Sequence, residues 1–229
     1  ADFWITVSTS LIPASNGKLM AIVDNGNGTH TYKWKSSYPI AQYLLSMAIT
    51  NYAQYTNYYH YSPTDSMPIN HFLYPGSLNA NIPQLNKTPG MIEIYAEHFG
   101  EYPFINEKYG HAQFGWGGGM EHQTMSFMFN FNYELIAHEL AHQWFGDYIT
   151  TESWSNLTLN ESFADLSETL WVEYKYGKDA GDETNYWGMQ GYLSSGGVSL
   201  DLVRFFYNDR EEMFDPVSYQ KGGRILNML

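Results

Sequence analysis

The chain contains the sequence His138-Glu139-Leu140-Ala141-His142, and a further acid, Glu161, follows within Leu159-Asn160-Glu161-Ser162. Two histidines four positions apart on a helix lie on one face about one turn apart, so their ring nitrogens can converge on one ion. Glu161, from a later helix, completes a set of two imidazoles and one carboxylate, which leaves the fourth position of a tetrahedral zinc open for water or substrate. The sequence therefore predicts one catalytic Zn²⁺ bound by His138, His142 and Glu161.

Glu139 lies directly after the first predicted ligand. From this position its carboxylate can reach a water on the metal without binding the metal itself, which is the place of the general base in H-E-x-x-H metalloproteases. The alternative is a solvated glutamate between two ordinary histidines, because H-E-x-x-H alone occurs by chance on many helices. The added Glu161 makes the pattern more specific and favours the zinc site.

The composition narrows the class of protein. The chain has 229 residues, no cysteine and a formal net charge of -13. Without thiolates, the zinc ligands can only be His, Asp or Glu. The excess of acids argues against nucleic acid or an anionic membrane as a partner. No apolar run reaches the roughly eighteen residues of a membrane span, so we expect a soluble protein, and both a cytoplasmic and a secreted location fit it.

Hydrophobic periodicity and turn residues predict strands first and helices later. The predicted strands are residues 3–7, 19–23 and 29–35. The predicted helices are residues 39–54 and 88–100, one that carries both histidines and is capped by Asn130 or Asn132, one from Thr158 or Asn160 to Gly177, and residues 181–194, 199–207 and 224–229. Residues 60–83 are expected to form a loop with one short strand at most. Three short strands without a core of their own indicate the end of a β domain.

Two further residues are candidates for the site on local grounds. Asp165 lies four residues after Glu161 on the same helix face, where its carboxylate could accept a hydrogen bond from a ligand imidazole, and a surface or capping acid is the alternative. Tyr219, placed before a new helix, could donate a hydrogen bond to the oxyanion formed when water attacks a peptide carbonyl. By position alone, a packed tyrosine is the simpler interpretation of Tyr219.

Glu121 follows a glycine-rich stretch that includes Gly118, Gly119 and Met120. Glycines permit a close approach of the backbone to a ligand. A peptide could pair with this edge as an added strand while the Glu121 carboxylate binds its positively charged amino terminus. A hairpin with an exposed glutamate explains the same residues equally well without further information.

Four segments together resemble the zinc aminopeptidase family typified by aminopeptidase N, and they occur in the order of that family. They are Gly118-Gly119-Met120-Glu121-His122, His138 to Asp147, Leu159-Asn160-Glu161-Ser162-Phe163-Ala164 and Ser218-Tyr219-Gln220-Lys221-Gly222. Two positions depart from the family pattern, which usually has Asn at His122 and Gly at Ser162. Neither departure removes a residue that carries chemistry.

The resemblance implies an α+β fold with a thermolysin-like catalytic domain, mostly helical with a small mixed sheet. Residues 32–229 would form this domain, cut at its carboxyl end, and residues 1–31 would be the remnant of a β domain. Contacts to further domains of the same enzyme are then expected. The resemblance also implies that Glu121 binds the free α-amino group of a peptide substrate and that Tyr219 stabilises the tetrahedral intermediate.

The predicted function is therefore a zinc-dependent aminopeptidase. Two alternatives stay open. An endopeptidase of the thermolysin type would use the same three ligands without Glu121, and a non-catalytic module would keep the zinc and lose turnover. The preferred first residue of the substrate, the oligomeric state and an additional epoxide hydrolase activity are not determined by these motifs.

Overall fold

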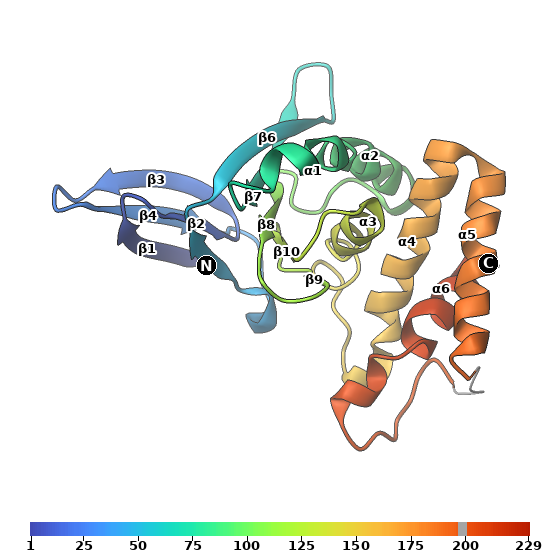
Figure 1. Ribbon diagram of the computed structural model, residues 1–229. Helices are drawn as coiled ribbons and strands as arrows, with labels where there is room; N and C mark the ends of the chain where they lie inside the picture. Colours follow the sequence, from blue (N-terminus) through green and yellow to red (C-terminus); the bar gives the residue numbers. More distant parts are fainter. Residues whose placement is uncertain (197–200) are drawn as a thin grey trace.

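Strands come first along the chain and helices come last (Figure 1). The computed structural model describes residues 1–196 and 201–229. Figure 1 shows the N-terminal strands on one side, a larger sheet with α1 to α3 in the middle, and α4 to α6 on the other side. The helices are α1 (Leu78–Leu85), α2 (Thr88–Phe99), α3 (Tyr133–Ala141), α4 (Thr158–Tyr176), α5 (Lys178–Ser194) and α6 (Gly222–Asn227).

The N-terminal segment forms two small antiparallel sheets. In the first, β4 (Thr29–Lys35) lies between β1 (Asp2–Ser8) and β3 (Lys18–Asp24), and in the second β2 (Ile12–Ser15) pairs with β5 (Met47–Thr50). The three strands predicted here are confirmed. The expected division between residues 31 and 32 falls inside β4, whose pairing with β1 runs to residue 35. We propose that the division lies after β4.

The helix predicted for residues 39–54 is wrong. This segment has a single 3-10 turn at Gln42–Leu44, then β5, and then the start of β6 (Ala53–His60). Apolar spacing suggested a helix, but in β5 the exposure alternates with a period of two, as in a strand. Pairing with β2 and a hydrogen bond from the Ser46 amide to Asn16 Oδ1 (2.8 Å) fix the extended course. Tertiary pairing has therefore overridden the local pattern.

The larger sheet is mixed and has the strand order β6-β7-β8-β10-β9. Its remaining strands are β7 (Ser66–Leu73), β8 (Tyr109–Gln113), β9 (Gly119–Met120) and β10 (Ser126–Met128). The three inner strands are parallel, and β6 and β9 run antiparallel at the two edges. The prediction of a loop over residues 60–83 is wrong in extent, because this segment contains the eight-residue β7 and most of α1. The end of the glycine-rich stretch forms the edge strand β9, and one side of its backbone has no strand neighbour among the described residues.

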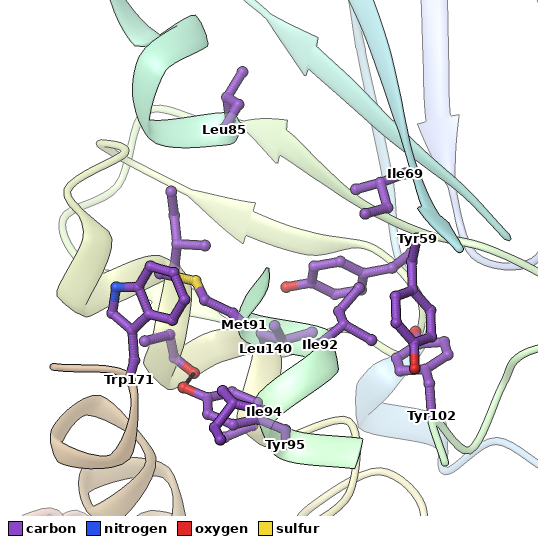
Figure 2. Packing of buried hydrophobic residues seen from close by; sticks show 14 of the residues in the cluster. Tyr59, Ile69, Leu85, Met91, Ile92, Ile94, Tyr95, Tyr102, Leu140 and Trp171 are labelled. Carbon is purple, nitrogen blue, oxygen red and sulfur yellow. Dashed lines mark hydrogen bonds between the residues drawn. The ribbon is translucent and has the colours of Figure 1, made fainter. Parts of the chain in front are cut away.

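One buried tyrosine ties together the two helices that carry the predicted zinc ligands. Tyr95 of α2 donates its hydroxyl to the carbonyl oxygens of Ala137 in α3 (3.2 Å) and Ser167 in α4 (2.8 Å). Figure 2 shows Tyr95 in one cluster of buried side chains with Leu140 of α3 and Trp171 of α4. The core therefore fixes the distance between α3 and α4.

The predicted helices of the C-terminal half are confirmed with one exception. Helices α3 to α6 lie where they were expected, and α4 begins at Thr158. Of the helix predicted for residues 199–207, positions 199 and 200 lie outside the described residues and positions 201–207 are not helical. Within the described part of the chain, no helix has the length and apolarity needed to cross a membrane.

Two buried histidines face each other across the centre of the sheet. His71 of β7 and His111 of β8 are register partners, their Nδ1 atoms are 2.9 Å apart, and both side chains are fully buried. Burial lowers the pKa of His111 to about 3, and burial together with His111 lowers the pKa of His71 well below its ordinary value. Both rings are therefore neutral in the folded protein at neutral pH.

This pair predicts a loss of stability in mild acid. Below the unfolded-state pKa of about 6.5 the unfolded chain binds protons that the folded chain does not, so the free energy of unfolding falls as pH decreases from 6.5, by about 2 kcal/mol per histidine at pH 5. Denaturant unfolding from pH 7.5 to 5 measures it. His111→Phe should reduce the dependence of the free energy of unfolding on pH. His60→Gln, which replaces an exposed histidine of β6, should leave this dependence unchanged. An unchanged slope in His111→Phe would remove the pair as the cause.

Candidate active site

Helices α3 and α4 bring the three predicted zinc ligands together. The Asn132 side chain caps α3 by accepting from the Leu135 amide (2.9 Å), which sets the start of the helix and hence the face that carries His138 and His142. His138 Nε2 lies 3.3 Å from Glu161 Oε2, and His142 Nε2 lies 3.4 Å from the same oxygen. The side chains of His142 and Glu161 are buried, and that of His138 is 12% exposed.

These three atoms fit a zinc ion. Ligand bonds of about 2.0–2.1 Å in a tetrahedron place neighbouring ligand atoms about 3.3–3.4 Å apart, which matches both separations from Glu161 Oε2. This oxygen is buried and accepts no hydrogen bond of ordinary geometry from the described residues. A set of two imidazoles and one carboxylate, with no thiolate, is the donor set of catalytic zinc. The residues present therefore fit the predicted metal.

Each ligand imidazole is oriented through its second nitrogen. His138 Nδ1 lies 2.9 Å from Glu168 Oε1, and His142 Nδ1 lies 3.0 Å from the Phe145 carbonyl oxygen. These contacts turn both Nε2 atoms toward Glu161. A carboxylate or a backbone carbonyl is the usual partner of a metal-binding imidazole.

The carboxylate that contacts His138 Nδ1 belongs to Glu168. The prediction that Asp165 makes this contact is wrong. Asp165 instead forms an ion pair with Arg224 of α6, and both side chains are largely buried. Glu168 is seven residues after Glu161, two turns along α4, so it also lies on the ligand face. Helical spacing alone allows either acid. The position of Arg224 decides between them, and sequence reasoning had no means to place it.

Glu139 is buried against the glycine-rich strand. A Cβ atom on Gly119 would collide with the Glu139 carboxylate, so the absence of a side chain in β9 makes room for this group. Burial raises the pKa of Glu139 to about 7, with Glu121 and Glu161 acting in the same direction and the two imidazoles against it. Its Oε2 atom is buried and accepts no hydrogen bond from the described residues. The carboxyl is therefore able to exchange a proton near neutral pH.

Glu121 follows β9 directly and lies close to Glu139. One ligand atom from each of Glu121, Glu139 and His142 falls within 4.8 Å of the others. Gly118, just before β9, has φ +81°, a conformation that favours glycine, and Met120 of β9 pairs with Phe127 of β10. The predicted substrate-binding stretch Gly118 to Glu121 thus runs along the edge of the sheet into the site.

Gln143 fixes the Glu121 turn and was not predicted from the sequence. Its side chain is fully buried, its Oε1 accepts from the Thr124 amide (2.7 Å), and its Nε2 donates to the Glu121 carbonyl (3.3 Å). Thr124 has φ +65°, which is unusual for a residue with a side chain. The residue after the predicted ligand His142 therefore holds both ends of the turn that carries Glu121.

Tyr219 stacks against the predicted ligand His138. It belongs to the π-helical turn Val217–Lys221, and its ring stacks on the His138 ring with centroids 6.0 Å apart. Burial and the charges of Glu161 and Glu121 raise the pKa of Tyr219 well above its ordinary value, and a hydrogen bond to Glu161 acts in the same direction. The hydroxyl therefore keeps its proton and is able to donate it in a hydrogen bond.

Tyr43 is a second site residue that sequence reasoning missed, because it falls in the segment predicted as a helix. Its hydroxyl donates to the Gly146 carbonyl (3.3 Å). Burial and the charges of Glu121, Asp147 and Glu161 raise its pKa well above the ordinary value of tyrosine. Tyr43 thus lies at the rim of the same acidic site, on the 3-10 turn before β5.

The fold and the ligand set define the thermolysin-like class of zinc metallopeptidase domains. The profile of the peptidase family M1 domain matches residues 84–229, and the chain belongs to this family. The predicted family and the α+β fold class are thereby confirmed.

Individual relatives agree with this assignment. The chain is 36% identical to aminopeptidase M1-A of Oryza sativa over 104 residues, 42% of this chain, and 27% identical to probable aminopeptidase 1 of Saccharolobus solfataricus over 98% of this chain. The crystal structure of the M1 zinc metallopeptidase of Deinococcus radiodurans superposes with a TM-score of 0.82 over 96% of this chain at 24% identity, which shows a shared fold. The aligned part spans 11%, 31% and 50% of these three proteins, respectively.

The contact between Glu168 and His138 predicts a role in metal affinity. Glu168→Gln removes the charge on the acceptor, and zinc affinity should fall about ten- to a hundredfold. Competition with a chromophoric chelator measures it. Asp165→Asn, on the same helix, should lower the thermal midpoint through Arg224 and leave zinc affinity within about threefold. The reverse pattern would restore the assignment of this role to Asp165.

The contact between Gly119 and Glu139 predicts a loss of turnover without loss of zinc. Gly119→Ala displaces the Glu139 carboxylate, so peptide hydrolysis should fall by at least about a hundredfold, as expected for a misplaced general base. Gly117→Ala is the matched control, since a Cβ there meets nothing within 4 Å. Turnover and zinc content are measured on the same samples. Equal activity of the two variants would contradict the packing argument.

Proposed function

We propose that this protein is a zinc-dependent aminopeptidase that hydrolyses the N-terminal peptide bond of peptides. The observation that carries the proposal is the placement of Glu121 beside Glu139 and His142, with one ligand atom of each within 4.8 Å of the others. An acid that binds an ammonium group and an acid that exchanges protons are thus separated by about the length of one amino-acid residue. This spacing suits cleavage of the first peptide bond of a chain.

One zinc ion, held by His138, His142 and Glu161, would supply Lewis acidity that polarises a carbonyl and lowers the pKa of water. Glu139 acts as the general base, removes a proton from the attacking water and delivers one to the leaving amine. A pKa of about 7 in the protein alone suits both directions of transfer. Because Gly119 has no side chain, the Glu139 carboxylate can lie against β9.

Two further groups orient the substrate and stabilise the charge that develops. Glu121 pairs with the substrate ammonium, while the free edge of β9 pairs with the substrate backbone as an added strand. Tyr219 donates a hydrogen bond to the oxyanion, and its raised pKa keeps the proton available for that bond. Tyr43, at the rim of the same acidic cluster, borders the place of the substrate's first residue.

Relatives support the choice of substrate class. The matched proteins of Oryza sativa and Saccharolobus solfataricus carry aminopeptidase names, and one structure of the Deinococcus radiodurans enzyme holds a Tyr-Ser-Ala substrate. A tripeptide with a free amino terminus is therefore the first substrate to assay.

The proposal predicts discrimination between free and blocked peptides. On the zinc-loaded full-length protein, kcat/KM for Tyr-Ser-Ala should exceed that for its N-acetylated form by at least about a thousandfold, because the partly buried carboxylate of Glu121 pairs with an ammonium group and not with an acetylated amine. Glu121→Gln should lower kcat/KM for the free peptide about a hundredfold, while Glu152→Gln, an exposed acid, should have no effect. Chromatography of the products measures both.

Two outcomes would overturn the proposal. Equal cleavage of the acetylated peptide would indicate an endopeptidase. Stoichiometric zinc without hydrolysis of any peptide would indicate a non-catalytic zinc-binding module.

A further inference from the structure

Ser162 makes a hydrogen bond that joins the backbones next to two site residues. Its Oγ donates to the Ser218 carbonyl oxygen at 2.6 Å, and both serines are fully buried. Ser162 follows the predicted ligand Glu161 in α4, and Ser218 precedes Tyr219 in the π-helical turn. The contact spans 56 positions of sequence, so it is a tertiary link between the ligand helix and the tyrosine segment.

The residues around the Ser162 hydroxyl pack closely against it. A Cβ on Gly222 would collide with Ser162 Oγ, so the start of α6 can approach α4 only because residue 222 is a glycine. The same Cβ would also lie 3.2 Å from Thr158 Cγ2. The pair of Ser162 and Gly222 therefore sets how closely the segment of Tyr219 packs against α4.

The Ser218 side chain is also fixed by hydrogen bonds to residues near it in sequence. Its Oγ donates to the Met213 carbonyl (2.7 Å) and accepts from Arg204 Nη2 (2.7 Å), and Arg204 also pairs with Asp215. Asp215 Oδ1 accepts from the amides of Val217 and Ser218 (3.1 Å each). These contacts fix the turn as a unit but none of them reaches α4. Among the hydrogen bonds of Ser218 within the described residues, only the one from Ser162 connects the turn to α4.

We propose that Ser162 is a positioning residue that sets the place of the Tyr219 hydroxyl relative to Glu161 and His138. The proposal rests on the function proposed above, in which Tyr219 donates to the oxyanion. A hydrogen bond made in the transition state depends steeply on distance and direction, so a small shift of the Tyr219 backbone weakens it. Ser162 touches neither metal nor substrate and acts through Tyr219 alone.

A matched pair of variants separates positioning from a general packing role. Ser162→Ala removes the hydroxyl that reaches Ser218. Ser167→Ala removes the hydroxyl of another fully buried serine in α4, which donates to the Phe163 carbonyl of its own helix (2.7 Å). Both variants lose one buried hydroxyl and one hydrogen bond to a carbonyl. They differ in whether the bond leads to Tyr219.

The expected result is a change in kcat that depends on Tyr219. With Tyr-Ser-Ala and the zinc-loaded full-length protein, Ser162→Ala should lower kcat about tenfold with KM within about twofold, and Ser167→Ala should leave both within about twofold. In a Tyr219→Phe background, Ser162→Ala should lower kcat no further, because the group it positions is gone. Ser162→Cys, which keeps a weak donor, should be intermediate.

A binding measurement gives a second readout. Calorimetry with a phosphinic pseudo-dipeptide, whose tetrahedral oxyanion resembles the intermediate, should show about tenfold weaker binding to Ser162→Ala and unchanged binding to Ser167→Ala. Zinc content and thermal midpoint are recorded for each variant.

The outcomes separate this inference from the proposed function. If the parent protein cleaves free peptides but Ser162→Ala behaves as Ser167→Ala does, or still lowers kcat tenfold in the Tyr219→Phe background, the positioning role is wrong and the aminopeptidase function stands. If the parent protein cleaves no peptide, the proposed function fails first. Should Ser162→Ala not fold, the comparison of Ser162→Cys with Ser167→Ala decides the matter by the same criteria.

Discussion

The site depends on one constraint: His138 of α3 and His142 at the carboxyl end of that helix converge on one oxygen of Glu161 in α4. Side chains from two helices meet within 3.3 to 3.4 Å only if the helices hold a fixed separation and rotation. Tyr95 provides this by donating to a backbone carbonyl of each helix from inside the core. Ligand geometry is thus an outcome of core packing, and the buried cluster around Tyr95 serves the site as directly as the ligands do.

The same site contains several buried acidic groups, and their negative charge needs nearby positive charge. Glu139, Glu161 and Asp147 are largely buried, and Glu121 lies beside them. Burial, followed by the charges of Glu121 and Glu139, raises the pKa of Asp147 well above its ordinary value. Buried carboxylates are stable when paired with cations. In the proposed function, a divalent ion at the ligand set and an ammonium group at Glu121 would balance this cluster, and metal binding and substrate preference would then meet one electrostatic requirement.

Local signals predicted the elements that carry chemistry, and tertiary contacts decided the rest. The capped helix of His138 and the helix of Glu161 follow from caps and periodicity, which act within a few residues. Residues 39–54 show a helical spacing as well, but Met47–Thr50 within them pair with β2 and form a strand. Asp165 and Glu168 share one helix face, and only Arg224, 59 positions after Asp165, determines which acid is free to hold His138. Gln143 and Tyr43 act through partners that no local pattern reveals.

Glycine at position 119 explains why the edge strand and the catalytic helix must be considered as one unit. One edge of β9 pairs with β10, and the Glu139 carboxylate lies where a side chain of Gly119 would project. A side chain at residue 119 would push that carboxylate away and leave the strand itself intact. Gln143 adds a second connection, from the end of α3 to the turn after β9. In the proposed function, a peptide paired with β9 would lie against Glu139 and Glu121 at once, so the same backbone would set the position of its amino terminus and of its first peptide bond.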